Sequence, residues 1–301
     1  MTADLILGAV DGYDFYEIEP FLVTLQQSGY PGHVVLFAGP RISSRTNRKM
    51  RTGGTEVIEF RDRFPFVEAP HHDNLSSLPE PIHICNFRYF LYYDYLLKYG
   101  RKFRNVLITD VRDVVFQRNP FQAGLSAEIH VAMENPSIPI GKCRWTAPWI
   151  VSAYGEQRLE ELRTQPMSCS GTTMAPVPLM LAYLRAILSE IQGMRSGDAY
   201  LDQAAHNVLL HDDQIGPVRR MQNFEGPILT VGSEPDFQLN GSDELVNRDG
   251  SVAAVVHQYD RHRELARIVE ARVRPSRRRR ALAKIGFWLR SRLLVRRARP
   301  I

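Results

Sequence analysis

The chain has 301 residues, of which 44% are hydrophobic, and it carries a formal net charge of +5 at pH 7. This composition is typical of a globular protein with one large or two small domains, and no apolar run approaches the roughly 18 residues of a membrane span. The N-terminus meets acidic residues where a signal peptide would carry basic ones, and Cys85, Cys143 and Cys169 are too far apart for a zinc motif or a disulfide framework. We therefore predict a cytoplasmic protein.

The positive charge is concentrated at the C-terminus. Residues 272–301 contain twelve of the 38 Lys and Arg residues and none of the 33 Asp and Glu, so the rest of the chain is acidic, with a net charge of −7. We predict a folded domain over residues 1–271 and a basic tail over residues 272–301. An acidic domain argues against nucleic acid as a partner.

Within the tail, Leu282, Ile285, Leu289 and Leu293 recur at helical spacing, with Trp288 and many basic residues beside them. A basic amphipathic helix of this kind is typical of attachment to an anionic membrane surface, here the inner face of the membrane. A solvated, disordered tail is the alternative. RNA binding has less support, because no folded RNA-binding module accompanies the tail.

The start of the chain alternates between strand and helix patterns. An apolar strand at Asp4–Val10 precedes a helix at Ile18–Ser28 and a second strand at His33–Phe37. This order predicts a doubly wound α/β sheet. A helix with a loop, a third strand, a proline-rich loop and an aromatic helix are predicted next, at Arg41–Gly54, Glu56–Phe60, Pro65–Pro81 and Asn86–Tyr99.

Arg88 lies near the start of that aromatic helix, on the loop side of the predicted sheet. It is either one partner of a surface ion pair or a contact for a phosphate or carboxylate, whose geometry suits a guanidinium.

The stretch Asn105–Phe121 contains a buried strand that ends on two acids, Asp110 and Asp113. Carboxylates at the carboxyl end of an α/β strand lie where open sheets bind ligands, and hard cations such as Mg²⁺ and Mn²⁺ prefer such oxygen ligands. The alternative is that the two acids merely cap a turn.

In the second half of the chain, the sequence pattern predicts shorter helices and strands. Ser168–Thr173, SCSGTT, consists of small residues and is predicted to be a turn, either an ordinary one or one that lets the backbone approach a ligand. Strands are predicted at Glu128–Glu134, Ile228–Val231 and Val252–Val256, and helices at Gln157–Arg163, Leu179–Ile191 and within Ser196–His211.

Polar residues follow several of the predicted strands: Asp11-Gly12-Tyr13, Asp110 with Asp113, Glu134-Asn135, and His257. Because the carboxyl ends of parallel strands share one crevice, two Asp and one His there suit Mn²⁺, although a His after a strand is often only a polar end. The chain has no G-x-G-x-x-G after its first strand, no P-loop and no G-x-S-x-G, which disfavours a nicotinamide-binding Rossmann domain and an α/β-hydrolase.

In this order the segments resemble GT-A nucleotide-sugar glycosyltransferases, in particular glycosyltransferase family 8, over about Asp4 to Arg263. The opening LILGAVDGYDFYEIEPFLVTLQQSG is similar to their nucleotide-binding segment, and VLITDVRDVVFQRNPF to their metal-binding Asp-x-Asp strand. DQAAHN resembles the start of the helix near the acceptor, and VVHQYDRH the segment whose His completes the metal shell.

The resemblance implies a GT-A domain, a mostly parallel sheet with flanking helices, that transfers a sugar from a nucleotide-diphosphate sugar to a glycan, lipid or protein. A UDP-sugar is favoured over a GDP-sugar, and a retaining reaction over an inverting one. It implies Mn²⁺ or Mg²⁺ on Asp110, Asp113 and His257, a donor held by Asp11, Tyr13, Arg88, Asp110 and Arg112, and catalytic roles for Asp202 and Gln203.

One position departs from the family motif, because Arg112 stands two residues after Asp110, where the second acid is expected. Either the turn is one residue longer and Asp113 is the second ligand, which we favour, or Asp110 binds alone and Arg112 contacts phosphate. Two rival functions remain: a nucleotidyltransferase, which would be expected to carry a basic glycine-rich loop after the first strand, and a non-catalytic protein that binds a membrane or RNA.

Overall fold

The structure, a computed structural model, describes residues 3–60, 83–194 and 200–274. Within them, a seven-stranded sheet has the order β3-β2-β1-β4-β7-β6-β8 and is parallel except that β7 runs antiparallel to both neighbours. The predicted α/β fold with a mostly parallel sheet is therefore confirmed. The strands are β1 (Ala3–Val10), β2 (His33–Ala38), β3 (Glu56–Glu59), β4 (Phe103–Thr109), β6 (Ile129–Met133), β7 (Ser168–Pro176) and β8 (Val218–Met221).

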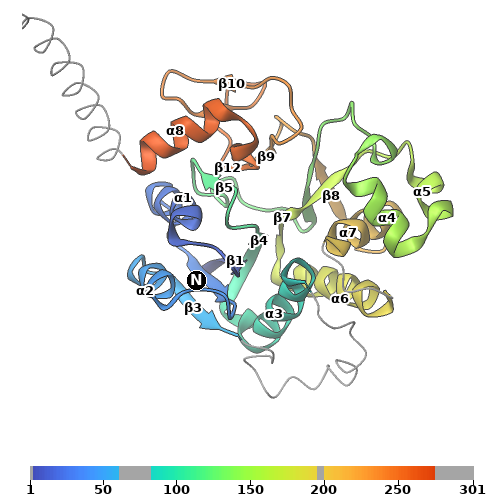
Figure 1. Ribbon diagram of the computed structural model, residues 1–301, viewed down its shortest axis with the longest axis horizontal. Helices are drawn as coiled ribbons and strands as arrows, with labels where there is room; N and C mark the ends of the chain where they lie inside the picture. Colours follow the sequence, from blue (N-terminus) through green and yellow to red (C-terminus); the bar gives the residue numbers. More distant parts are fainter. Residues whose placement is uncertain (1–2, 61–82, 195–199, 275–301) are drawn as a thin grey trace, which may run out of the picture.

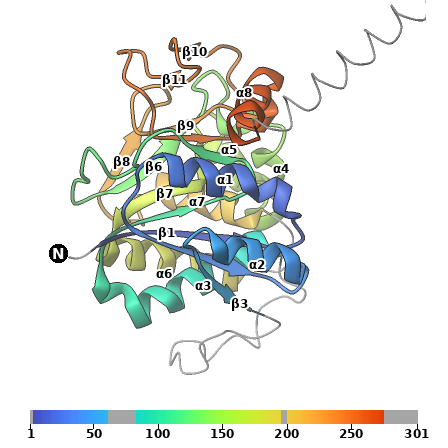
Figure 2. The ribbon, with the colours of Figure 1, turned by 90° about the vertical axis from the view of Figure 1, so that its left-hand side faces the viewer.

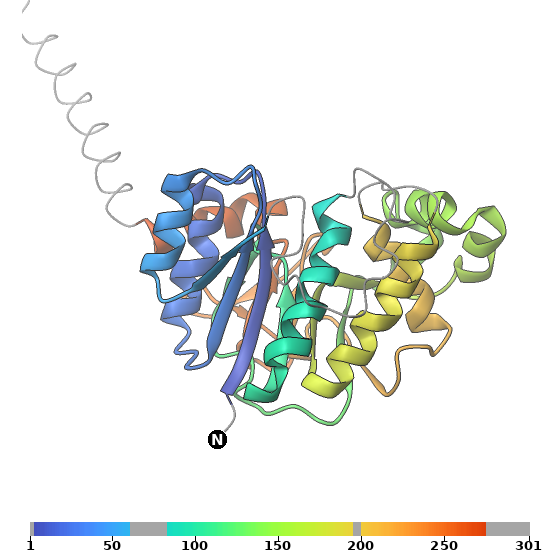
Figure 3. The ribbon, with the colours of Figure 1, turned by 90° about the horizontal axis from the view of Figure 1, so that it is seen from below.

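Helices cover both faces of this sheet (Figures 1 and 3). On one face α3 and α6 lie side by side and α7 packs beside them, while α1 and α2 pack on the other face. Two shorter helices, α4 and α5, stand next to α7 at the β7–β6 side. The helices are α1 (Phe15–Gln27), α2 (Ser44–Thr52), α3 (Ile84–Tyr99), α4 (Thr146–Tyr154), α5 (Glu156–Leu162), α6 (Val177–Gly193), α7 (Leu201–His211) and α8 (Arg263–Val273).

The buried strands follow from alternation of their apolar side chains. In β1, Leu5 and Leu7 point into the core under α3 and α6, whereas Ile6 points into the core under α1. All three are fully buried, as expected for a parallel sheet covered on both faces, whose strands are apolar throughout. In β1, polar side chains are therefore confined to Asp4 near the start of the strand and Asp11 directly after its end.

A second, three-stranded sheet lies beyond α1 (Figure 2). Its central strand β12 (Val255–His257) is antiparallel to β5 (Val114–Phe116) and parallel to β9 (Ile228–Thr230). The register pairs His257 with Val114, the residue directly after Asp113. The predicted strand Val252–Val256 is thus displaced toward the C-terminus, and His257 belongs to the strand rather than to the loop after it.

The prediction of a turn at Ser168–Thr173 was wrong. These residues form the first two thirds of β7, and they are buried between β4 and β6. Small residues gave no apolar alternation to detect, but their size lets the strand pass close to the site. Three further short strands had no predicted counterpart: β8, β10 (Gln238–Leu239) and β11 (Leu245–Val246).

The predicted boundary between domain and tail at residue 271 falls inside α8, which continues to Val273. The remainder of the tail and the predicted loop Pro65–Pro81 lie outside the described residues. Within the described ranges, no helix combines the length and the apolarity that a bilayer crossing requires.

Candidate active site

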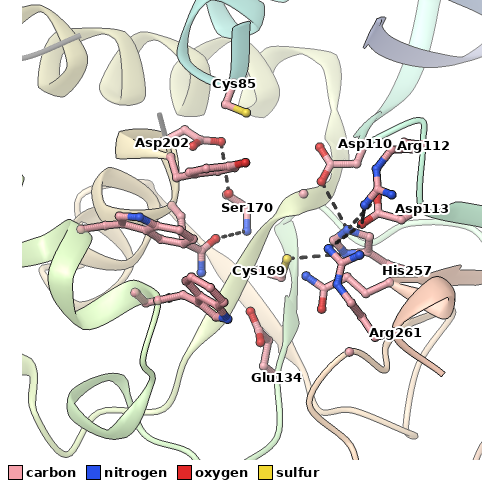
Figure 4. Close-up of a pocket in the computed structure, with 18 of the residues that line it drawn as sticks. Cys85, Asp110, Arg112, Asp113, Glu134, Cys169, Ser170, Asp202, His257 and Arg261 are labelled. Carbon is pink, nitrogen blue, oxygen red and sulfur yellow. Dashed lines mark hydrogen bonds and ion pairs between the residues drawn. The ribbon is translucent and has the colours of Figure 1, made fainter. Parts of the chain in front are cut away.

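The predicted site residues surround one large cavity, with a volume of about 1100 Å³, at the carboxyl ends of β1, β4 and β6 (Figure 4). Because β7 runs in the opposite direction, it brings its beginning, Cys169 to Gly171, to the same edge. The cavity has two walls: Asp110, Asp113 and His257 lie on one side of β7, and Asp202 lies on the other.

Asp110, Asp113 and His257 form a compact cluster on the first wall. One ligand atom from each lies within 4.8 Å of the others, and Nε2 of His257 is 3.3 Å from Oδ2 of Asp110 and 3.8 Å from Oδ1 of Asp113. Asp110 follows the last residue of β4, and the β5–β12 pairing carries His257 to the two acids. The structure thus brings together all three predicted metal-binding residues, with Asp113 in the cluster.

The electrostatics of this cluster favour a bound positive charge. Burial alone would raise the pKa of Asp110, but the charges of Arg88 and His257 outweigh it and lower that pKa. Burial raises the pKa of Asp113, and the nearby Asp110 carboxylate adds to this. Burial alone would lower the pKa of His257, yet its interactions with Cys169 and Asp110 raise it well above the ordinary value. Two carboxylates a few ångströms apart, Asp113 buried and Asp110 partly exposed, therefore stabilise a cation between them.

The cluster fits a divalent cation on two further grounds. Nε2 of His257 is buried and faces both acids, so in the neutral imidazole, after loss of its proton, its lone pair would be directed at a cation held by them. Gly171 lies directly against the cluster, where a Cβ atom would stand 2.5 Å from Cε1 of His257 and 2.6 Å from Oδ2 of Asp110. Two carboxylates and an imidazole are a donor set that suits Mn²⁺.

Arg88 links the two walls. It is 9% exposed, and its guanidinium pairs with Asp110 on one side and with Oδ2 of Asp202, at 2.8 Å, on the other. The sequence left open a surface ion pair, but the Arg88 guanidinium and its partner Asp202 are buried. A buried guanidinium needs such partners because an unpaired charge is costly there.

The predicted donor residues lie on the first wall. Asp11 accepts hydrogen bonds from the backbone N–H and from Nε of Arg41, both at 2.9 Å. Tyr13 lines the cavity, and burial raises its pKa to about 12, so its hydroxyl stays protonated. Arg112 bridges Asp113 of the cluster and Asp260: one terminal nitrogen is 3.6 Å from Asp113 and the other is 2.8 Å from Asp260.

Asp202 and Gln203 begin α7 on the second wall. Gln203 uses both ends of its amide on β7: Nε2 donates to the backbone carbonyl of Ser168 and Oε1 accepts from the N–H of Ser170, each at 2.8 Å. Oδ1 of Asp202 is buried without a hydrogen bond within the residues described. Gln203 therefore holds α7 against β7, and Asp202 is the one with an open acceptor atom.

Several lining residues were not predicted. Arg261 pairs with Asp113 and Asp260, at 3.3 and 2.7 Å, and lines the cavity beside Arg112. Its position four residues after His257 was the one sequence feature that could have indicated a place in the site. Trp145, Trp149 and Tyr200 line the second wall, and their aromatic character in a region without clear periodicity gave only a weak indication.

No protein-family model and no curated protein sequence matches the chain. Among solved structures, the chain has the GT-A fold of nucleotide-sugar glycosyltransferases. An active-site mutant of LgtC is 13% identical with a TM-score of 0.50, over 90% of this chain and 95% of that one. The galactosyltransferase LgtC in complex with donor and acceptor sugar analogues is 14% identical with the same TM-score, over 89% and 95%.

Core-mannan synthase A from Aspergillus fumigatus, in a form with manganese and GDP, is 9% identical over 70% of both chains, with a TM-score of 0.45. The predicted resemblance to the GT-A fold is confirmed by the LgtC structures, and the assignment to family 8 stays a prediction.

Proposed function

We propose that the protein is a metal-dependent glycosyltransferase that uses a nucleotide-diphosphate sugar as donor. The observation that carries the proposal is the cluster of Asp110, Asp113 and His257 beside a large cavity, at the strand ends of a GT-A fold. Sheets of this kind bind ligands at the carboxyl ends of their strands. A cation there is surrounded by enough space for a nucleotide and a sugar.

Asp110, Asp113 and His257 would hold Mn²⁺ or Mg²⁺. When bound, the cation supplies Lewis-acid stabilisation of the negative charge on the departing nucleoside diphosphate. Arg112 and Arg261 stand on the same wall with side chains 33% and 45% exposed, so both can turn a guanidinium edge toward phosphate oxygens. Tyr13 and Asp11 lie farther along this wall, where they would contact the base and ribose.

The second wall would hold the transferred sugar and the acceptor. Arg88 orients the Asp202 carboxylate through one oxygen, which leaves the other free to accept a hydrogen bond from a sugar hydroxyl. In the transfer, the bond between the anomeric carbon and the diphosphate oxygen breaks, the acceptor oxygen forms a bond to the anomeric carbon, and the proton of the acceptor hydroxyl passes to the departing diphosphate. We propose retention of the anomeric configuration and a UDP-sugar donor, as the sequence resemblance implies. NMR of the initial product tests the stereochemistry.

The test is hydrolysis of a panel of UDP-sugars and GDP-sugars by the purified chain. The measured quantity is the nucleoside diphosphate released from each donor. We expect release from one donor with Mn²⁺ and none with EDTA. The substitution Asp113→Asn should abolish it because it removes one of the two carboxylates. Asp213→Asn is the matched control, since the Asp213 side chain is 88% exposed and lies outside the cavity lining.

Hydrolysis of neither donor class with Mn²⁺ present would refute the proposal. Release of pyrophosphate from a nucleoside triphosphate with a sugar phosphate would instead identify a nucleotidyltransferase. Unchanged Mn²⁺ dependence in Asp113→Asn would show that the second ligand was assigned incorrectly.

A further inference from the structure

The cations that line the cavity fall into two groups. Of six Lys and Arg side chains there, four form ion pairs with Asp residues of the site: Arg41, Arg88, Arg112 and Arg261. The other two, Lys142 and Arg144, have no ion-pair partner among the described residues, and both are exposed. Two unpaired cations in a cavity attract an anionic group of a ligand.

The same part of the cavity carries exposed aromatic surface. Large hydrophobic side chains that are exposed within the described ranges number four, and two of them, Trp145 at 57% and Tyr200 at 46%, line this cavity. Exposed apolar surface that gathers in a cavity, rather than being scattered, marks a binding site.

These aromatic rings are arranged as a row. Trp149 stacks on Tyr200 with 4.8 Å between ring centroids and on Trp145 with 6.5 Å, at interplanar angles of 25° and 22°. The guanidinium of Arg144 lies 4.8 Å from the centre of a Trp145 ring. The row therefore has flat, nearly parallel faces and a cation fixed at its outer end.

The row leads to the catalytic end of the second wall. Tyr200 is the residue before α7 and stands two residues before Asp202. Its backbone has a φ of 68°, a left-handed conformation that a Tyr rarely adopts. The start of α7 thus fixes both the inner ring of the row and the Asp202 carboxylate.

We propose that Trp145, Trp149 and Tyr200, together with Lys142 and Arg144, form the acceptor subsite, and that the acceptor is an anionic glycan. A pyranose ring has apolar C–H faces that pack flat on an aromatic ring, while its hydroxyls point outward. A carboxylate or phosphate on that sugar would pair with Arg144 and Lys142. Arg112 and Arg261, on the opposite wall, are left for the donor diphosphate.

The role of acceptor rests on the proposed glycosyltransferase function, but binding of the sugar itself can be measured without a donor. The chain has three tryptophans, Trp145, Trp149 and Trp288, so in a Trp288→Phe background the fluorescence excited selectively from tryptophan comes from Trp145 and Trp149 alone. The probes are the methyl glycosides of glucose and galactose, the corresponding uronic acids, and the corresponding 6-phosphates.

We expect saturable fluorescence changes with the uronic acids or the 6-phosphates, and binding at least about five-fold weaker for the neutral glycosides. Whichever anionic series binds more tightly identifies the anionic group. Trp145→Ala should weaken binding about ten-fold, read from Trp149. The double change Lys142→Gln, Arg144→Gln should bring anionic sugars to the affinity of neutral ones.

Matched controls come from outside the cavity. Tyr16→Ala removes an aromatic ring that is 43% exposed, and Arg248→Gln removes an arginine side chain that is 65% exposed. Neither should alter binding. Neutral and anionic sugars of equal affinity, or full affinity in Trp145→Ala, would overturn the subsite. Anionic sugar binding without hydrolysis of any nucleotide sugar would overturn the proposed function and leave the subsite standing.

Discussion

The two walls of the cavity are held in place by different forces. The first wall is fixed by charges: Asp110, Asp113 and His257 lie within one cluster, and Arg112 and Arg261 neutralise its outer side. The second wall is fixed from behind by neutral hydrogen bonds between α7 and β7. In front, it presents stacked rings and two cations that have no acidic partner in the part of the chain that the structure describes.

From this difference we infer which wall should change in energy or shape when each ligand binds. A cluster of two close acids, one of them buried, changes its energy strongly when a cation binds, because charges interact strongly where water is largely excluded. A wall made of neutral hydrogen bonds and aromatic faces keeps its shape when a ligand binds, and selects by fit and by its outer charges. We expect metal and donor to act on the first wall and the acceptor to meet a preformed second wall.

The largest effect should come from Arg88, which joins the walls. Arg88→Gln removes the cation shared by Asp110 and Asp202 and leaves the buried Asp202 carboxylate without a cationic partner, so the free energy of unfolding should fall by about 3 kcal/mol or more in urea titrations. The control is Arg118→Gln, because the Arg118 side chain is 44% exposed in its pair with Glu244 and should contribute less than about 1 kcal/mol. Similar losses in both variants would contradict a buried link.

A second change should affect the first wall and not the second, and it keeps all three metal-binding side chains. Gly171→Ala places a methyl group against His257 and Asp110, so Mn²⁺ affinity should fall about 10- to 100-fold, while the fluorescence response to anionic sugars stays intact. Thermal shift against Mn²⁺ concentration measures the affinity. Gly193→Ala is the control because a Cβ there meets nothing within 4 Å. Unchanged Mn²⁺ affinity in Gly171→Ala would argue against the cluster as the metal site.

The third change tests the neutral support of the second wall. His206 is fully buried, with its ring nitrogens 2.8 Å from the Tyr183 hydroxyl and 2.9 Å from Oγ of Ser168. Burial lowers its pKa from 6.5 to about 3, so the folded state favours neutral His206. This stabilisation is present above pH 6.5 and is lost as the pH falls toward 3.

Between pH 7.5 and pH 5.0 the contribution of His206 to the free energy of unfolding should therefore fall by about 2 kcal/mol. The measurement is urea unfolding at both pH values for the wild type and for His206→Gln. The variant should be less stable at pH 7.5 and should lose about 2 kcal/mol less on acidification. An equal loss in both proteins would show that His206 does not titrate in this way.

Much of the fold and of the first wall could be predicted from the sequence. Apolar strands that alternate with helices indicated the sheet, and acids at the end of the strand Val106–Thr109 indicated a cation site. His257 could be joined to them only through the resemblance and the order of segments, because its contact with Asp110 depends on β5 and β12 pairing across 140 residues of chain.

The second wall was predicted less well for physical reasons. Ser168–Thr173 has neither the apolar alternation nor the branched side chains along its whole length that indicate a strand, and its pairing with β4 and β6 decided its conformation. The burial of Arg88 depends on Asp110 and Asp202, which are distant in sequence. The exposure of Trp145 follows from packing, which residue type alone does not reveal.

The reversed direction of β7 has a consequence for how such a protein can change. Loops after strands tolerate insertions and deletions, so the segments that follow β1 and β6 can alter in length without disturbing the sheet. Cys169 to Gly171 have less freedom, because they lie inside β7, where Cys169 pairs with Ala132 of β6 and the Gly171 carbonyl accepts a hydrogen bond from the Asp110 N–H. Along this part of the cavity, substitutions can change the size of a side chain but insertions cannot change the length of the chain. Gly171 already has the smallest side chain possible.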